Sequence, residues 1–421
     1  MNRKILQTAS IYTFFSIINQ AINLVAQLVI MRGFPVTQFG HYAICFEALA
    51  LLQLVLSNAS RNFYLQKIKS GSETVLSLMN YQAINGSLLI IFFGVIVCYF
   101  YNLDAIVSSY LILGNVLSSL LLPLQAKWLS ENKRWLIIIR DTSVSLISLS
   151  FIFISVKLFN SGVETIAITQ FIIYGAVPLI FIFIFQRDIF FIENIKRIVR
   201  VKFRFESSLL IFCLIFFVNA LHNKYGGIFL RNFSDGFQTA IYLATFKFIN
   251  PLFFIQTSLI SAFMPSFIKA DNFKFDRKVF LVFALPGFII ALMLFIFYPL
   301  ALSILGIEQY ITSYELIKSG CLFVFIVFVY GAMSNYISIS GGQNYILAVN
   351  ILALSLMLVS SYFIVNVKFT ALALIHIFVI AECLICILYF LYIYKKRIEI
   401  SFFFFFSPLL ALLVEFLLIV R

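Results

Sequence analysis

Two pairs of asparagines lie at the same register inside two strongly apolar stretches of the sequence. Asn19 and Asn23 occur in SIINQAINLVAQ. Asn219 and Asn223 occur in FFVNALHNKYGG. Residues four apart share one face of a helix, so each pair forms a polar stripe. An amide that faces lipid is costly, so each stripe should face protein or water. Two interpretations stay open, a polar cavity between helices and hydrogen bonds that only hold helices together.

Ionisable side chains inside apolar stretches are the second group of candidates, because charge within a membrane marks functional sites. Glu47 and Lys247 are 200 residues apart, like the members of the two asparagine pairs, and lie ~10 Å from the outer ends of their stretches. They are candidates for an outer-gate ion pair, and the alternative is that each extends to the interface or pairs locally. Glu382 lies near the middle of another stretch, where a carboxylate can bind a coupling proton or sodium ion, or pair with a lysine. Side chains suited to binding phosphate are Arg32, Arg61, Lys224, Arg231 and Lys247. For the three arginines, anchoring at the membrane interface is the alternative.

The composition requires a membrane. Of the 421 residues, 62% are hydrophobic and 11% are charged, and the mean hydropathy is +1.05. A soluble domain is about half apolar and a quarter charged, so this chain could not cover its own surface in water. Apolar runs such as 281–305 are long enough for membrane-spanning helices, whereas a membrane barrel would show alternating strands of ~10 residues. We therefore expect an all-α integral membrane protein.

The apolar stretches predict twelve core spans, and whether the later stretch 402–420 also spans the membrane stays open. With the N-terminus in the cytoplasm, most of the 30 basic residues fall in cytoplasmic connections, as the positive-inside rule requires. The predicted spans are 8–31, 41–60, 79–101, 104–126, 136–158, 165–186, 207–231, 238–264, 280–305, 316–340, 343–365 and 370–394.

The longest polar connection, 187–206, divides the chain into two halves. We expect a six-helix lobe over 1–200, a second over 201–397, and an extra apolar segment over 398–421. Six spans return the chain to its starting side, so the two repeats are parallel. Transporters built in this way hold their site between the halves. The expected architecture is therefore two parallel six-helix bundles with a cavity between them.

The sequence shows no pattern of cysteines, histidines or catalytic motifs that is typical of an enzyme. The six cysteines lie in apolar segments and the three histidines are scattered, so we expect no metal, cofactor or disulfide framework. No P-loop, GxSxG or HExxH motif occurs, so no catalytic residue is assigned. The net charge of +13 is explained by topology signals and anionic lipids rather than by nucleic acid.

Two local motifs and the overall layout resemble a known family. The amide-bearing first span leads into Arg32 and then 38–42, Gln-Phe-Gly-His-Tyr, which is similar to an Arg…Phe-Gly-x-Tyr opening. The second half begins with 223–230 and 240–242, where Asn223 and Ala240 replace the more usual Asp and Gly, and continues to 263–265, Phe-Met-Pro. The sequence thereby resembles the polysaccharide-export (O-antigen and capsule repeat-unit) flippases of the multidrug/oligosaccharidyl-lipid/polysaccharide (MOP) superfamily.

The resemblance implies a fold, a function and a location. The fold would be a V of two parallel six-helix bundles around a central cavity. The substrate would be an undecaprenyl-diphosphate-linked oligosaccharide, moved by alternating access from the cytoplasmic to the outer leaflet of a bacterial inner membrane. The expected partners are membrane lipids, a polysaccharide polymerase and, from the position of Glu382, a coupling proton or sodium ion. Two other classes stay open. A drug/cation antiporter of the same fold would favour acidic cavity residues, and a membrane polysaccharide polymerase or ligase would carry a large outer loop.

Overall fold

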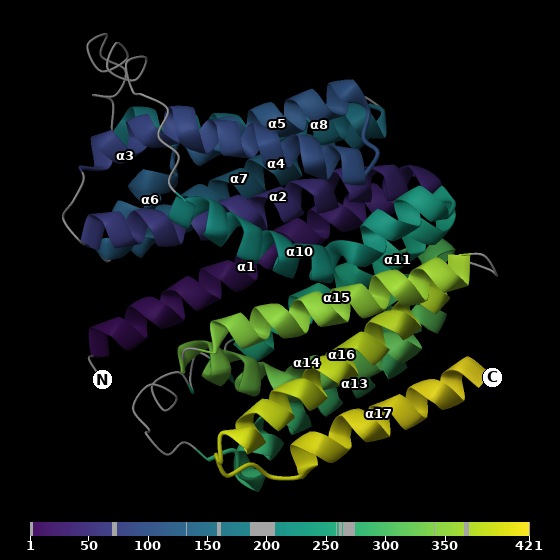
Figure 1. Cartoon of the computed structure of the whole chain (residues 1–421). Coiled ribbons are helices and arrows are strands. Elements are labelled where there is room, and N and C mark those ends of the chain that lie inside the picture. Colours follow the sequence, from purple (N-terminus) through teal and green to yellow (C-terminus); the bar gives the residue numbers. More distant parts are fainter. Residues whose placement is uncertain are drawn as a thin grey trace. The chain divides into compact units, whose positions relative to one another are not determined.

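The protein is built from helices (Figure 1). They form two compact units, Met1–Lys224 and Tyr225–Arg421. The predicted linker 187–206 lies outside the described residues, and the division into lobes 1–200 and 201–397 with a segment 398–421 stays a prediction. The computed structural model describes residues 3–69, 74–131, 133–157, 161–185, 207–257, 259–260, 263, 274–340, 342–365 and 370–420.

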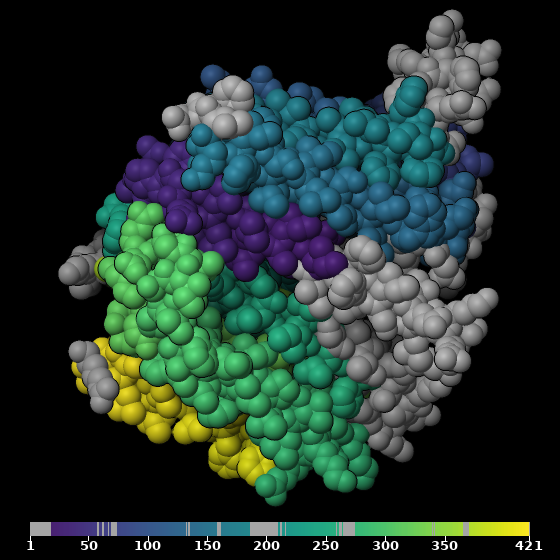
Figure 2. Space-filling view, turned by 180° about the vertical axis from the view of Figure 1, so that it is seen from behind, coloured from purple at the N-terminus to yellow at the C-terminus, as the bar shows by residue number. Residues whose placement is uncertain are grey.

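The first unit contains eight named α-helices, one π-helix and the first part of α10 among its described residues. Helices α1 and α7 pack along each other, as do α5 and α8. The purple N-terminal segment and the blue segments of this unit lie side by side at the surface in Figure 2. The elements are α1 (Arg3–Gly33), α2 (Val36–Lys69), α3 (Val75–Tyr81), the π-helix η1 (Gln82–Gly86), α4 (Ser87–Phe100), α5 (Ala105–Ser119), α6 (Leu122–Ser130), α7 (Arg134–Lys157), α8 (Val163–Phe185) and α10 (Ser207–Phe233).

The second unit is organised around α14, which packs against α11, α13, α15, α16 and α17. The apolar window of α14 is 72% buried, whereas that of α13 is 22% buried, so α14 lies in the core of the unit and most residues of α13 do not. The elements after α10 are α11 (Gly236–Ile249), η3 (Asn250–Leu252), α13 (Arg277–Ile304), η4 (Glu308–Tyr310), α14 (Ser313–Ile339), α15 (Gln343–Val365), α16 (Ala371–Lys395) and α17 (Phe403–Val420).

Ten helical segments among the described residues are long and apolar enough to cross a membrane. Helix α17, which covers the stretch left open by the sequence, is one of them. Strand pairing in the described part of the chain is limited to one isolated bridge between Phe275 and Ile400. These findings confirm the prediction of an all-α, multi-pass membrane protein.

Side-chain caps explain where several helices begin. Asp235, Asp276 and Thr370 each precede a helix and accept a hydrogen bond from the backbone N–H three residues further along. Such caps satisfy one of the N–H groups that the first turn leaves without a partner. They set the starting points of α11, α13 and α16.

Small residues allow α5 and α8 to approach closely. A Cβ atom on Gly114 would collide with the backbone carbonyl oxygen of Phe171, and one on Gly175 would lie 3.2 Å from the Cα of Gly114. Close backbone approach at glycine is a common way for membrane helices to associate, because lipid gives no hydrophobic driving force between them.

Replacing Gly114 by leucine should therefore separate α5 from α8. We expect Gly114→Leu to lower the melting temperature of the purified protein, with a loss of about 1–3 kcal/mol from overpacking. Gly162 is the matched control, because a Cβ there meets no atom within 4 Å. The Gly162→Leu variant should stay within about 0.5 kcal/mol of the wild type. Equal stability of the two variants would contradict this packing.

Candidate functional site

A polar cavity of about 300 Å³ lies within the helices of the first unit. Its wall combines side chains from α1, α2, α5, α6, α7 and α8, so every one of these helices helps to shape it. The wall is rich in carboxamides, which can both donate and accept hydrogen bonds. The carboxamide residues are Asn19, Gln20, Asn23, Gln53 and Gln125.

The α1 stripe supplies the clearest sign that this cavity is wet or holds a ligand. Asn19 and Asn23 both line it, as their spacing of four residues on one helix face allows. The Oδ1 atom of Asn19 is buried and has no hydrogen-bond partner among the described residues. Buried polar atoms in native proteins are nearly always satisfied, by protein or by water. A donor from water or a ligand is therefore expected at this atom.

The same stripe also helps to hold helices together. Gln27, one turn beyond Asn23, lies 3.5 Å from the hydroxyl of Tyr42 on α2 through its Nε2 atom. The Tyr42 hydroxyl donates to Oε1 of Gln170 on α8 at 2.8 Å. Tyr42, Gln27 and Gln170 are all buried, so this network ties α1, α2 and α8 together beside the cavity. Asn19 and Asn23 therefore line the cavity, whereas Gln27, on the same helix face, holds helices together.

An arginine–aspartate pair forms the charged part of the cavity wall. Nε of Arg140 donates to Oδ1 of Asp141 at 2.7 Å, and Nη2 donates to the same oxygen. The Arg140 side chain is 18% exposed and that of Asp141 is 38% exposed. A guanidinium carries five N–H donors, so donors remain for an anionic or hydroxyl-bearing ligand. The pair is close to neutral overall, so the cavity suits a polar ligand better than a simple ion.

Arg140 and Asp141 were not among the site residues predicted from the sequence. The pairing of neighbours is visible in the sequence, but their position opposite the α1 amides depends on how α7 is rotated against α1. A polar dipeptide inside a predicted span was the available signal, because charged residues in spans usually face the bundle interior.

A second charged group in the first unit is the buried pair of Glu47 and Lys224. Oε2 of Glu47 lies 2.6 Å from Nζ of Lys224, and the two side chains are 8% and 15% exposed. Lys224 was predicted to bind substrate, which stays a prediction, and its charge is compensated by Glu47 in this structure. Lys247 belongs to the second unit, so the expected Glu47–Lys247 gate stays a prediction.

The other residues that the sequence predicted to bind substrate or a coupling ion keep those roles as predictions. Nδ2 of Asn223 donates to the carbonyl oxygen of Asn219 in its own helix at 2.9 Å. Oε2 of Glu382 accepts a hydrogen bond from the hydroxyl of Tyr330 at 2.7 Å, and Glu382 is buried. Arg32 is exposed, Arg231 and Lys247 are half-buried, and the side chain of Arg61 lies outside the described part of the structure.

The comparison with known proteins identifies the fold. No family model matches the sequence, and no curated protein matches it. The chain is similar to an inward-facing conformation of a multidrug resistance MATE family transporter of the MOP superfamily, with 13% identity, a TM-score of 0.60, and coverage of 90% of this chain and 94% of that one. It is also similar to an outward-facing conformation of such a transporter, with 12% identity, a TM-score of 0.54, and coverage of 92% and 94%. The chain therefore has the fold of MOP-superfamily transporters, as its sequence predicted.

Breaking the Glu47–Lys224 pair should destabilise the protein. Removing one partner of a buried ion pair leaves an uncompensated charge, at a cost of about 3–5 kcal/mol. We expect Glu47→Gln and Lys224→Gln each to lower the melting temperature, and the double variant to lose less than the sum of the two. Thermal unfolding of the purified chain measures this double-mutant cycle.

The exposed pair of Lys133 and Glu131, at 2.7 Å, supplies the control. Glu131→Gln should cost less than about 1 kcal/mol, because exposed ion pairs contribute little. If Glu47→Gln is no more destabilising than Glu131→Gln, the buried pair does not exist in the folded protein.

Proposed function

We propose that the protein is a transporter that works by alternating access. Its substrate would be a polyprenyl-diphosphate-linked oligosaccharide, moved from the cytoplasmic to the outer leaflet of a bacterial inner membrane. The observation that carries this proposal is the amide-rich cavity of about 300 Å³ inside the first unit, with Arg140 in its wall. A volume of this kind among membrane helices is out of place in a purely structural bundle, which would pack apolar side chains there.

The chemistry of the cavity suits the polar part of such a lipid. Sugars and diphosphate cannot enter hydrocarbon without replacement of their hydration. Carboxamides can exchange hydrogen bonds with sugar hydroxyls, and a guanidinium makes charge-assisted hydrogen bonds to phosphate. The polyprenyl chain would stay in the lipid. The other proposed substrate-binding residues are Asn19, Asn23, Arg32, Arg61, Asn219, Asn223, Lys224, Arg231 and Lys247.

The fold supports alternating access as the mode of transport. The two similar structures are named as inward-facing and outward-facing conformations, so proteins with this fold adopt both arrangements. In this proposal the N-terminus is cytoplasmic, and a polysaccharide polymerase acts on the delivered substrate. Glu382 would bind a coupling proton or sodium ion, and Glu47 and Lys247 would meet when an outer gate closes.

A drug/cation antiporter is the second candidate, because both similar structures are multidrug transporters and the Asp141 carboxylate lines the cavity. We favour the lipid-linked oligosaccharide because Arg140 already neutralises Asp141 at hydrogen-bond distance. A cavity for a cationic drug would be expected to leave its carboxylate available.

Loss of the protein should trap lipid-linked repeat units on the cytoplasmic leaflet. Cells without the gene would then accumulate these units out of reach of a glycosidase added from the outer side. Resistance to cationic drugs should not change. Normal surface polysaccharide together with drug sensitivity would instead favour the antiporter.

Arg140→Gln should impair the transport that restores surface polysaccharide in such cells. One charge-assisted hydrogen bond contributes about 1.5–3 kcal/mol, so we expect a loss of about 10- to 100-fold in the transport rate. Lys133→Gln, which removes an exposed charge outside the cavity, is the matched control and should transport normally. Normal transport by Arg140→Gln at equal protein level would remove Arg140 from the site.

A further inference from the structure

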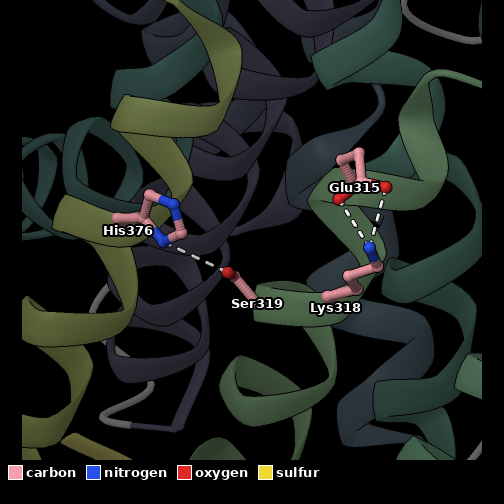
Figure 3. A network of polar contacts seen from close by, with 4 residues as sticks. All are labelled: Glu315, Lys318, Ser319 and His376. Atoms are coloured by element: carbon pink, nitrogen blue, oxygen red, sulfur yellow. Dashed lines mark hydrogen bonds and ion pairs between the residues drawn. The ribbon is translucent and has the colours of Figure 1, made fainter. Parts of the chain in front are cut away.

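Three helices of the second unit meet at one imidazole nitrogen. Nδ1 of His376, on α16, lies 3.2 Å from the hydroxyl oxygen of Ser319 on α14 (Figure 3). The same Nδ1 lies 2.6 Å from Oε1 of Glu415 on α17. The nitrogen thus has a hydroxyl partner on one helix and a carboxyl partner on another.

The carboxyl of Glu415 lies in surroundings that do not tolerate an isolated charge. Its side chain is 1% exposed, and its Oε2 atom is buried without a hydrogen-bond partner among the described residues. A buried carboxylate is stable only when its charge is compensated or when it carries a proton. His376 is the neighbour that can supply this proton, and its side chain is 12% exposed, so the imidazole reaches the surface of the protein whereas the carboxyl does not.

We propose that His376 and Glu415 form a proton-binding site that docks α17 on the second unit. One proton, beyond the one that a neutral imidazole keeps on its ring, is shared between Nδ1 and Oε1. It leaves the pair neutral whether it lies on the nitrogen or on the oxygen. When the proton leaves through His376 to solvent, Glu415 keeps a buried negative charge, and α17 loses its charge-assisted hydrogen bond to α16. The Ser319 hydroxyl can then donate to the vacated Nδ1.

The geometry excludes two other roles for these residues. A catalytic triad uses both imidazole nitrogens, one for the nucleophile and one for the carboxylate. Here Ser319 and Glu415 share the same nitrogen, so Ser319 is not activated in that way. A metal site is not indicated either, because the described residues contain no group of three or more His, Cys, Asp or Glu side chains that could hold an ion. The proton is the ligand that fits.

The position of the pair explains why it would control α17 in particular. The chain just before this helix is already tethered by the bridge between Phe275 and Ile400 and by the exposed pair of Lys274 and Glu399. Glu415 lies twelve residues into α17, about 18 Å from its start, and is the only acidic residue of the helix. The His376–Glu415 contact is therefore the polar attachment nearest the far end.

The other carboxyl groups on the neighbouring helices are bonded to partners of their own. Glu315 and Lys318 on α14 bond to each other and point toward one another rather than toward His376 (Figure 3). Glu382 on α16 is bonded to Tyr330 of α14. The remaining groups are Tyr314, Cys321 and Tyr336 on α14, Cys383, Cys386, Tyr389, Tyr392, Tyr394 and Lys395 on α16, Tyr242 and Lys247 on α11, Tyr345 and Tyr362 on α15, and Arg277, Lys278 and Tyr298 on α13.

Hydrogen–deuterium exchange of the full chain in lipid nanodiscs tests the proposal without any transport substrate. Exchange is measured at mildly acidic and at alkaline pH, and rates are corrected for the intrinsic pH dependence of amide exchange. Wild-type α17 should lose protection at alkaline pH, whereas α15 should keep it. In Glu415→Gln the neutral amide still bonds the imidazole, so α17 should stay protected at both pH values.

Glu399→Gln is the matched control, because it removes an exposed carboxylate next to the same helix and should keep the wild-type response. Equal protection of wild-type α17 at both pH values overturns the proposal, whichever variants fold. A wild-type response in Glu415→Gln, or its loss in Glu399→Gln, also overturns it. The result bears only on proton binding and leaves the transport proposal unaffected.

Discussion

The structure depends on one constraint, that polar groups within hydrocarbon must find partners in the protein or in enclosed water. This chain meets the constraint in three ways. Glu47 and Lys224 compensate each other as a buried ion pair. Tyr42 and Gln170 join helices through a buried hydrogen bond. The Asn19 carboxamide instead lines a cavity, and its Oδ1 atom has no hydrogen-bond partner in the part of the chain that the structure describes. The first two solutions stabilise the bundle, and the third provides a place for a ligand.

The cavity links this constraint to function. Its wall presents donors and acceptors from six helices, so a change in how these helices pack would alter the site. Proteins of the same fold adopt inward-facing and outward-facing conformations. A ligand shifts such an equilibrium only when it binds the two states differently. In our account, bonds between a polar ligand and the cavity wall supply that difference.

The sequence was sufficient to predict the membrane helices, but not which side chains of different helices contact each other. Apolar runs such as 281–305 predicted membrane helices, because length and composition alone decide whether a helix can span. The spacing of Asn19 and Asn23 placed them on one helix face for the same local reason. The partner of Lys224 and the position of Arg140 could not be predicted, because periodicity defines the faces of a helix but not which face meets which neighbour. The contact of Glu415 with His376 could not be predicted either, because the two residues lie in different helices.

The central claim is that the cavity of the first unit receives the polar part of a lipid-linked oligosaccharide. The most direct measurement is photo-crosslinking in membranes that contain the radiolabelled lipid, with a benzophenone amino acid at Gln20, an exposed residue of the cavity wall. The reference position is Phe416, an exposed apolar residue of α17. Our account predicts a labelled product at Gln20 that excess unlabelled lipid-linked oligosaccharide abolishes, and no such product at Phe416. Labelling at Phe416 alone, or labelling at Gln20 that excess lipid does not reduce, would contradict it.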